Sequence, residues 1–214
     1  MRIATVRDSA LDAIKKANTK FDYVLMLDAD VFELSIRGII ASFSDHIPSW
    51  DVLTANGRYW NFSLAFSILP YVKNAYYDTF AIQQVYDEAK PFDRQISLWR
   101  IFSALRKNSM LFPVCSAFGG MGLYKYKAVE TARYFDASQE DDFQFCEHIS
   151  FHRKLKEAGF PSVFVNPAMM LYYNNPLRAF FSGLVKTLIG KKIHALCKAL
   201  TSKRKLRIKD NETL

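Results

Sequence analysis

The sequence contains little cysteine and no long hydrophobic run. Its 214 residues include three cysteines, and none of them forms a Cys-x-x-Cys pair. This number and spacing exclude the disulfide framework of a small secreted domain, so we expect reduced thiols. The first residues, MRIATVRDSA, lack the apolar core of a signal peptide, and no stretch reaches the roughly 18 apolar residues of a membrane span. We therefore expect a cytoplasmic protein, either free or peripherally attached to a membrane.

The sequence also lacks a P-loop, a protein-kinase signature, internal repeats and a low-complexity linker. The first two absences argue against the phosphotransferases that depend on those motifs. Half of the residues are hydrophobic and 15% are aromatic, which is enough to bury a sizeable core. The length suits a single domain, or a domain with an appendage.

Positive charge is concentrated at the end of the chain. Residues 176–214 contain ten of the 29 Lys and Arg residues but only two of the 21 Asp and Glu residues. The first 175 residues therefore carry 19 basic and 19 acidic side chains, and the tail carries the whole net charge of +8. A nucleic-acid-binding protein more often spreads its charge across a folded face. We expect no nucleic-acid partner, and a separate partner for the tail.

The order of the predicted elements is typical of an α/β fold. Tyr23–Leu27 is a short apolar run of β-forming residues, which suits a strand buried on both faces. Helical patterns flank it, and this alternation predicts a mostly parallel central sheet flanked by helices. Residues 58–95 are rich in aromatics without a clear period, and we interpret them as a variable insert. The patterns predict helices over residues 8–19, 33–44 and 146–158, and further strands over residues 51–55 and 162–167.

Two carboxylates, Asp28 and Asp30, follow the first predicted strand with one alanine between them. If extended geometry continues through Ala29, both side chains project to the same side. Paired carboxylates repel each other unless a cation or proton lies between them, and their oxygens suit Mg²⁺ or Mn²⁺. Ligands also tend to bind at the carboxyl ends of strands in open α/β sheets. We interpret the pair as ligands of a metal that bridges a diphosphate. The alternative is a solvated strand end at which Asp28 caps a turn.

Three glycines occur within Phe118–Gly122, between short predicted strands. Glycine lets the backbone approach a ligand closely or adopt a positive φ. One interpretation of Gly119 and Gly120 is therefore the wall of a ligand pocket that offers backbone N–H donors. The other is a tight hairpin turn.

A second polar cluster precedes and enters the last predicted helix. Asp141 and Asp142 are acids near a helix N-terminus, where the macrodipole favours them. Glu147 is the candidate general base. His148 and His152 lie one helical turn apart, as in some metal sites, and either can be a third metal ligand or an acceptor contact; we select His148 as the ligand. The alternative for Glu147 and both histidines is the polar face of a surface helix.

These motifs, in this order, resemble the GT-A glycosyltransferases, which use a nucleotide-diphosphate sugar and usually Mn²⁺ or Mg²⁺. VLMLDADVF is similar to their Asp-x-Asp strand, and RIATVRDSALDAI is similar to the helix that precedes this strand in several mannosyltransferase families. CSAFGGMGLYK and CEHISFHRKLKEAGF resemble the later segments near the donor sugar and the acceptor. The similarity is to fungal capsule-associated mannosyltransferases and to viral or bacterial enzymes of the same style, and it covers roughly residues 2–175.

The resemblance implies a Rossmann-like GT-A fold that transfers a hexose or deoxyhexose to a hydroxyl of a glycan or lipid-linked acceptor. It implies that Glu147 is the base if the reaction inverts configuration, a role that disappears if the reaction retains it. It implies the following roles for the other positions: metal binding by Asp28 and Asp30, with His148 as a possible third ligand, contact with the ribose or diphosphate by Arg7, and a wall of the sugar pocket by Gly119 and Gly120. For Arg7 the alternative is an exposed residue at a helix start.

The family usually has several strands and helices before the Asp-x-Asp strand, whereas 27 residues precede Asp28 here. We therefore expect a GT-A-like domain over residues 1–175 whose N-terminal part is short or truncated. Two alternatives to a glycosyltransferase stay open. One is a non-catalytic domain that binds a glycan or a partner protein, and the other is a different Mg²⁺-dependent nucleotidyl- or phosphotransferase.

Residues 176–214 are predicted to form a basic, amphipathic helical tail. Apolar residues from Leu177 to Leu200 recur at helical spacing, and lysines lie among them. A stripe of this kind can lie in the interface of an anionic membrane. The alternative is a terminal helix that packs on the domain and leaves its lysines in solvent.

Overall fold

The computed structural model describes residues 2–17, 19–44, 47–65, 69–82, 105, 110–134 and 146–190. The chain divides into two compact units. The first, which we call the sheet unit, comprises Met1–Tyr59 and Ala75–Asn174. The second, the hairpin–helix unit, comprises Trp60–Asn74 and Asn175–Leu214, so it includes residues that the sequence analysis assigned to the domain over residues 1–175.

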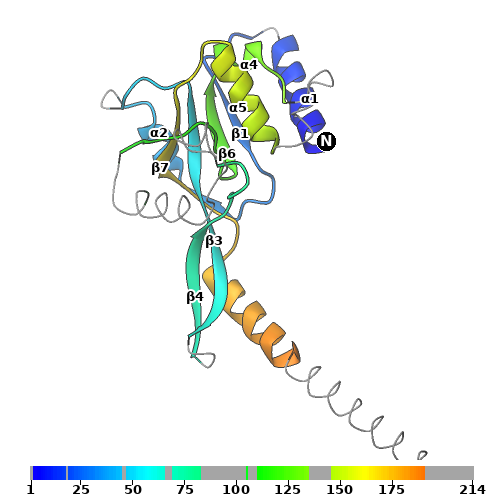
Figure 1. The fold of residues 1–214 in the computed structure, drawn as a ribbon, viewed down its shortest axis with the longest axis vertical. Coiled ribbons are helices and arrows are strands. Elements are labelled where there is room, and N and C mark those ends of the chain that lie inside the picture. Colours follow the sequence, from blue (N-terminus) through cyan, green and yellow to red (C-terminus); the bar gives the residue numbers. More distant parts are fainter. Residues whose placement is uncertain are drawn as a thin grey trace, which may run out of the picture. The chain divides into compact units, whose positions relative to one another are not determined.

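The fold is α/β, as predicted, but its sheet is mixed rather than mostly parallel (Figure 1). β3 and β7 pair in parallel, whereas β6 runs antiparallel to both β1 and β3, and β2 and β5 run antiparallel to β7. The chain enters β6 directly from a turn at Gly119 and Gly120, both of which have positive φ angles. The strands in sheet order are β1 (Tyr23–Leu27), β6 (Met121–Lys125), β3 (Val52–Ala65), β7 (Val163–Tyr172) and β2 (Glu33–Leu34), with β4 (Leu69–Tyr76) beside β3 and β5 (Phe112–Pro113) beside β7.

Helices cover both faces of the sheet. Successive strand residues point to opposite sides, so neighbouring residues of one strand belong to different cores. Val52 belongs to the core beneath α1, α4 and α5, whereas its neighbour Leu53 belongs to the core on the side of α2. Figure 1 shows α1, α4 and α5 grouped together and α2 apart from them. The helices are α1 (Arg2–Lys16), α2 (Ile36–Ala41), α4 (Tyr126–Thr131) and α5 (Glu147–Glu157).

α1 begins at Arg2, and the prediction that it starts near residue 8 is wrong. Asp8 and Ser9 look like N-caps in the sequence, but both lie inside the helix. The Asp8 carboxylate accepts a hydrogen bond from the backbone N–H of Tyr134 (2.7 Å), and the Ser9 hydroxyl donates to the carbonyl of Thr5 (3.0 Å). Arg7 is therefore an internal residue of α1 and not an exposed helix start.

The other element predictions vary in accuracy. The strand at 23–27 is confirmed in its extent, and α5 matches the predicted helix to within one residue at each end. The prediction that this strand is buried on both faces is wrong, because β1 lies at the end of the strand order β1-β6-β3-β7-β2 and its residues Tyr23, Leu25 and Leu27 are 41–46% exposed. The predicted helix over 33–44 is instead the short strand β2 followed by α2, which Ser35 caps through its hydroxyl. The predicted strand over 51–55 continues as β3 to Ala65, and β4 follows it, so much of the supposed insert is regular β-structure.

The hairpin–helix unit consists, in its described part, of β3 from Trp60 onward, β4 up to Asn74 and a helix over residues 176–190. The rings of Phe62 and Phe180 meet edge to face with centroids 6.0 Å apart. A Cβ on Gly183 would overlap the Phe62 ring, so the helix and the hairpin are in close contact. The predicted helical tail is thus present up to residue 190, and residues 191–214 lie outside the described part. Within the described residues, none of the helices combines the length and hydrophobicity that crossing a membrane requires.

Candidate functional site

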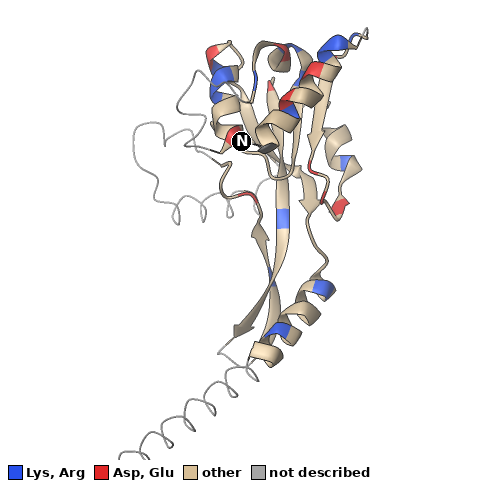
Figure 2. Cartoon of the chain, turned by 90° about the vertical axis from the view of Figure 1, so that its right-hand side faces the viewer, with Lys and Arg blue, Asp and Glu red and all other residues tan. Residues whose placement is uncertain are grey.

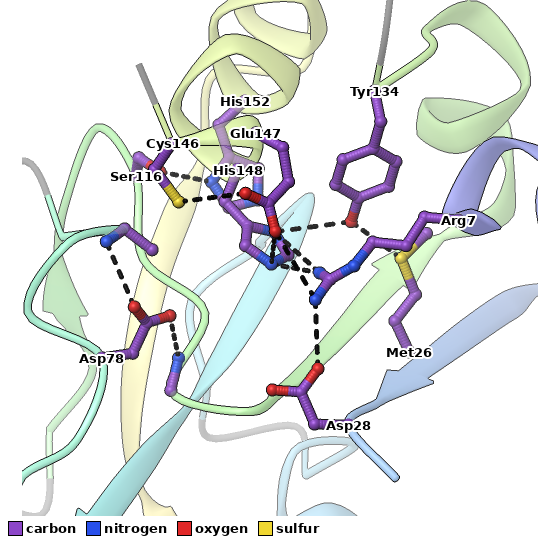
Figure 3. Close-up of polar contacts among 12 residues, drawn as sticks. Arg7, Met26, Asp28, Asp78, Ser116, Tyr134, Cys146, Glu147, His148 and His152 are labelled. Carbon is purple, nitrogen blue, oxygen red and sulfur yellow. Dashed lines mark hydrogen bonds and ion pairs between the residues drawn. The ribbon is translucent and has the colours of Figure 1, made fainter. Parts of the chain in front are cut away.

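A pocket of about 420 Å³ lies at the carboxyl end of β1 in the sheet unit. Its walls come from α1, the turn after β1, the segment after β4 and the first turn of α5 (Figure 3). Residues far apart in the sequence therefore meet here, including five that the sequence analysis selected. The charged and imidazole side chains that line it are Arg7, Asp28, Asp30, Asp78, Glu147 and His148.

The guanidinium of Arg7 is the centre of this cluster. Its Nη2 lies 3.0 Å from Asp28 Oδ1 and 3.7 Å from Glu147 Oε1, and its Nη1 donates a hydrogen bond to Nε2 of His148. The Arg7 side chain is 18% exposed, and its guanidinium lies over the ring of Phe118 at 4.6 Å. Arg7 thus holds α1, the end of β1 and the start of α5 together, while part of its charge still faces the pocket.

His148 is a buried, neutral partner of Arg7. Because guanidinium groups only donate, Nε2 of the imidazole must accept, which places the ring proton on Nδ1, 3.5 Å from the Tyr134 hydroxyl. The ring also stacks on Phe118, with centroids 3.8 Å apart. Burial, and then the charge of Arg7 and the neighbouring His152, lower the pKa of His148 well below 6.5. The side chain is 2% exposed.

Both oxygens of the Asp28 carboxylate are hydrogen-bonded. Oδ1 accepts from Arg7, and Oδ2 accepts from the hydroxyl of Tyr173 (2.8 Å), the residue that follows the last residue of β7. Burial raises the pKa of Asp28 above 3.8, and the negative charges of Asp30 and Glu147 act in the same direction. The hydrogen bond from Tyr173 and the charge of Arg7 act against this rise without cancelling it. Burial is therefore the main influence on the ionisation of Asp28, and the neighbouring acids add to it.

Asp30 reaches the same pocket by a different route from the one predicted. β1 ends at Leu27, and Ala29 and Asp30 form a turn, so the expectation of two side chains on one strand face is wrong. The turn nevertheless leaves Asp28 and Asp30 on the wall of one pocket. Asp30 is exposed, whereas Asp28 is partly buried.

Asp78 is a third pocket aspartate, and the sequence analysis missed it. Its two oxygens accept backbone hydrogen bonds from Ala81 (3.2 Å) and Gly119 (3.3 Å). Burial raises its pKa above 3.8, and the charges of Asp28 and Glu147 add to the rise. An acidic residue just after a strand is a recognisable signal, but β4 itself was not predicted, so the signal could not be used.

Gly119 and Gly120 form a buried turn behind the site. Their φ angles are +63° and +88°, which side chains with a Cβ rarely adopt. A Cβ on Gly119 would lie 2.2 Å from the carbonyl oxygen of Ala55, and one on Gly120 would lie 2.0 Å from the Tyr173 hydroxyl. The carbonyl of Gly120 accepts from the backbone N–H of Asp28 at 2.9 Å. The close approach that requires these glycines is to neighbouring protein atoms, and it positions Asp28 and Tyr173.

His152 is also buried, so the alternative of a polar surface face is wrong for both histidines of α5. Nδ1 of His152 lies 3.0 Å from the Ser116 hydroxyl, and Nε2 lies 3.2 Å from the Tyr124 hydroxyl. Burial lowers the pKa of His152 to about 3. Its contacts are those of a structural core residue, and it is not part of the pocket wall.

The remaining predictions for this region concern thiols and acids. Asp141 and Asp142 lie outside the described residues. Cys146 precedes α5 at the pocket, and burial, aided by the charge of Glu147, raises its pKa to about 12. It is therefore a thiol at neutral pH and not a nucleophile. Cys115 and Cys146 both occur as thiols, as expected, and Cys197 lies outside the described residues.

The donor set of the pocket suits a hard divalent cation. Four carboxylates face one guanidinium and a neutral imidazole, so negative charge is in excess. Mg²⁺ binds through one or two carboxylates and completes its shell with water and phosphate oxygens. Among the described residues, no three His, Cys, Asp or Glu side chains converge closely enough to hold a metal by themselves. Nε2 of His148 already accepts a hydrogen bond from Arg7, so it could bind a metal only after losing that contact. A metal role for His148 stays a prediction.

No protein-family model matches the sequence, and no curated protein sequence matches it either. Membership of the GT-A glycosyltransferases therefore stays a prediction. The function has to be judged from the geometry and charge of the pocket.

Proposed function

We propose that the protein is a metal-dependent glycosyltransferase of GT-A type that takes a sugar from a nucleotide-diphosphate sugar. In this reaction the bond between the sugar and the diphosphate breaks, and a bond forms between the sugar and an acceptor hydroxyl of a glycan or lipid-linked molecule. The nucleoside diphosphate leaves with the bonding electrons. The acceptor hydroxyl loses its proton to a base.

One observation carries the proposal: Arg7, Asp28, Asp30 and Glu147 line a single pocket at the carboxyl end of a strand. They were selected separately for roles in binding a metal and a diphosphate and in deprotonating an acceptor. They come from three segments that are distant in sequence, so their meeting is a property of the fold. The pocket volume of about 420 Å³ is within the range of small-ligand sites.

The direction of the strands gives further support. β1 and β3 both run antiparallel to β6, and β3 runs parallel to β7, so these three strands point the same way. Asp28 follows β1 and Tyr173 follows β7, and the two are hydrogen-bonded at 2.8 Å. Ligands of open α/β sheets bind at this edge.

Asp28 and Asp30 would hold Mn²⁺ or Mg²⁺, which neutralises charge on the leaving diphosphate when bound. Carboxylate oxygens have more than one acceptor site each, so the hydrogen bonds from Arg7 and Tyr173 leave room on Asp28 for a further partner. Tyr173 fixes the orientation of that carboxylate. Asp30 is the more accessible of the pair.

The protein's own groups would divide the remaining tasks. The part of the Arg7 guanidinium that faces the pocket would contact phosphate oxygens, to which it offers charge-assisted hydrogen bonds. Glu147 would accept the acceptor proton in an inverting reaction. His148, neutral and hydrogen-bonded to Arg7, would keep the guanidinium in place between Asp28 and Glu147.

A second candidate is a domain of the same type that binds a sugar nucleotide or glycan without turnover. The observation that favours it is the occupation of Asp28, which engages Arg7 through one oxygen and Tyr173 through the other. Asp28 would bind a metal only if the free energy of metal binding exceeded the free energy lost when its contacts with Arg7 and Tyr173 weaken. A nucleotidyl- or phosphotransferase is the third candidate, and nothing in the geometry favours it over the first.

Product analysis distinguishes the three candidates. The protein is incubated with a panel of nucleotide-diphosphate sugars and Mn²⁺, with water as the acceptor, and the released phosphates are separated by chromatography. A glycosyltransferase releases the nucleoside diphosphate. A nucleotidyltransferase breaks the bond between the two phosphates and releases the sugar 1-phosphate. A binding domain releases neither. The expected product is the nucleoside diphosphate.

Two variants make the assay specific to the pocket. Asp30→Asn removes one charge from an exposed turn without touching the Arg7 ion pair, and it should abolish the release. Asp22→Asn removes a charge from the opposite end of β1, at a residue that is also exposed, and it should leave the release unchanged. Equal release by both variants would contradict the proposed site.

A further inference from the structure

The hairpin–helix unit carries the excess positive charge of the protein. Its residues, 60–74 and 175–214, include eleven of the 29 Lys and Arg residues but two of the 21 Asp and Glu residues, both of which lie in 191–214. The stretches 60–74 and 175–190 contain no acidic residue at all. Figure 2 shows charges of both signs over the helices of the sheet unit and only basic colour on the helix over 176–190.

The same helix exposes a continuous apolar face. Leu177, Phe181, Leu184 and Leu188 follow the spacing i, i+4, i+7 and i+11, which places them on one side of a helix. Val185 and Ile189 extend that side. Five of the six are more than half exposed, at 51–67%: Leu177, Phe181, Val185, Leu188 and Ile189.

This face is left over after the helix has packed within its own unit. The opposite side of the helix already has a partner, because Phe180 and Gly183 contact Phe62 of the hairpin. The hairpin adds further exposed apolar surface at Leu69 and Tyr71. A large apolar patch on a water-soluble surface is costly unless something covers it.

We propose that the hairpin–helix unit docks the protein on the surface of an anionic lipid bilayer. The apolar face of the helix would enter the boundary between headgroups and acyl chains, as amphipathic interfacial helices do. Arg178, Lys186 and the basic residues of 191–214 would be attracted to anionic headgroups. This inference does not depend on the proposed function, because it uses no residue of the pocket.

Charge and chemistry favour a bilayer over two other occupants. A second copy of the chain would bring two surfaces of the same sign together, which costs energy. A nucleic acid would engage the lysines and arginines, but exposed aliphatic side chains such as Leu177 and Leu188 gain nothing from phosphates or sugars. A bilayer with anionic headgroups interacts favourably with both the apolar face and the basic residues.

Vesicle flotation of the full chain tests the proposal. Vesicles of phosphatidylcholine alone are compared with vesicles that also contain phosphatidylserine, at low and at high salt. The expected result is strong binding to the mixed vesicles, weak binding to the neutral ones, and partial release by salt, since only the electrostatic part is screened.

Substitutions on the exposed face separate the two contributions. The triple variant Leu177→Gln, Phe181→Gln, Leu188→Gln should lower the partition coefficient at least about tenfold, because each side chain loses apolar area that the bilayer would bury. The double variant Arg178→Gln, Lys186→Gln should lower binding to the mixed vesicles by about fivefold per residue, the ratio that corresponds to about 1 kcal/mol. Binding of this variant to the neutral vesicles should not change.

A matched control is available in the sheet unit, at Phe32 just before β2 and at Ile36 and Ile40 of α2. Phe32, Ile36 and Ile40 are exposed to a similar degree, at 53%, 66% and 66%. Replacing all three with Gln removes as much exposed apolar surface, and it should leave vesicle binding unchanged. Circular dichroism of each variant checks that the fold is retained, which these exposed positions should permit.

Several outcomes would overturn the proposal. Absence of binding to either vesicle would do so, and so would binding that the triple Gln variant leaves intact. Binding of single-stranded RNA or duplex DNA that competes with vesicles and ignores the triple variant would assign the surface to a nucleic acid. A concentration-dependent dimer in analytical ultracentrifugation that the triple variant abolishes would assign it to a second copy.

Discussion

The two units of this protein handle charge in opposite ways. The sheet unit brings acids and bases together, and its Arg7 contacts two carboxylates and a neutral imidazole in a partly buried cluster. The hairpin–helix unit has basic residues without acidic ones over 60–74 and 175–190, and it leaves one apolar face of its helix exposed. A cluster of mixed charge with an excess of carboxylates suits a small ligand that brings a cation, whereas a basic and apolar surface suits an external partner. Under the two proposals, the same chain would bind a ligand with one unit and attach to a membrane surface with the other.

The largest difference between the units is expected from their glycines. Gly119 has a φ of +63°, and a Cβ there would lie 2.2 Å from the Ala55 carbonyl, so Gly119→Ala should lower the free energy of unfolding by about 3 kcal/mol. Gly190, on the helix of the other unit, has open space around it, and Gly190→Ala should change stability by about 1 kcal/mol or less. Chemical denaturation measures both. Similar values for the two variants would show that the turn at Gly119 yields easily and does not fix the site.

The next effect is a loss of stability in mild acid, which should arise in the sheet unit. His152 has a folded pKa of about 3 and an unfolded pKa near 6.5, so its contribution is complete above pH 6.5 and is lost as the pH falls toward 3. His148, whose pKa is also lowered, acts in the same direction. Each should cost about 1.4 kcal/mol per pH unit within its window.

The variant His152→Gln isolates the contribution of His152 to the pH dependence of stability. Its free energy of unfolding, measured by denaturation between pH 7 and pH 5, should fall less steeply than that of the parent by about 1.4 kcal/mol per pH unit below 6.5. Asp28 and Asp78 have raised pKa values and act in the opposite sense, but they are common to both proteins and cancel in the difference. Parallel slopes would mean that His152 is not buried in its neutral form.

A smaller effect is expected at the tyrosine that holds Asp28. Tyr173→Phe removes a hydrogen bond of 2.8 Å and should lower the free energy of unfolding by about 1 kcal/mol. That hydrogen bond lowers the pKa of Asp28, so its loss should raise this pKa further. Metal binding needs the ionised carboxylate. As the pH is lowered, metal-dependent nucleotide binding should therefore be lost at a higher pH in the variant than in the parent.

The control for this variant comes from the other unit. Tyr71 is 42% exposed on the hairpin, and Tyr71→Phe should have little effect on stability and none on the pH dependence of binding. If both variants gave the same pH profile, Tyr173 would have no influence on the ionisation of Asp28.

The smallest effect on stability is expected on the exposed helix face. The triple variant Leu177→Gln, Phe181→Gln, Leu188→Gln should change the free energy of unfolding by no more than about 0.5 kcal/mol, because these side chains are exposed. Thermal and chemical denaturation measure the change. A loss above about 2 kcal/mol would indicate that the face is packed against protein and is not available to a membrane.

Short-range patterns in the sequence correctly predicted those elements whose limits depend on neighbouring residues alone. β1 is a continuous apolar run, and α5 is followed by Gly159, whose φ of +92° ends the helix as a glycine stop should. Longer-range constraints were invisible. The predicted strand over 51–55 stopped before Asn56 and Gly57, yet both lie inside β3. Gly57 packs against the backbone of a distant segment, since a Cβ there would lie 2.1 Å from the carbonyl oxygen of Gly119, and no local pattern reveals such a contact.

The site shows the same division. Arg7, Asp28 and Glu147 were each selected from their motifs, but nothing in the sequence indicated that Arg7 would pair with both acids. Asp78 and Tyr173 were missed, since each follows a strand end that was not predicted. Charged side chains that meet through tertiary structure are found only when the strands that carry them are placed correctly.

The most direct test of the pocket as a donor site is a calorimetric titration. The purified protein, its Asp30→Asn variant and the triple Gln variant of the exposed helix face are titrated with a panel of nucleoside diphosphates, with and without Mn²⁺. We predict that one nucleotide binds the parent and the triple variant equally in the presence of Mn²⁺, and binds Asp30→Asn at least about tenfold more weakly, a loss of about 1.4 kcal/mol or more. Absence of nucleotide binding under every condition, or equal binding by Asp30→Asn, would contradict a metal-dependent donor site at the end of β1.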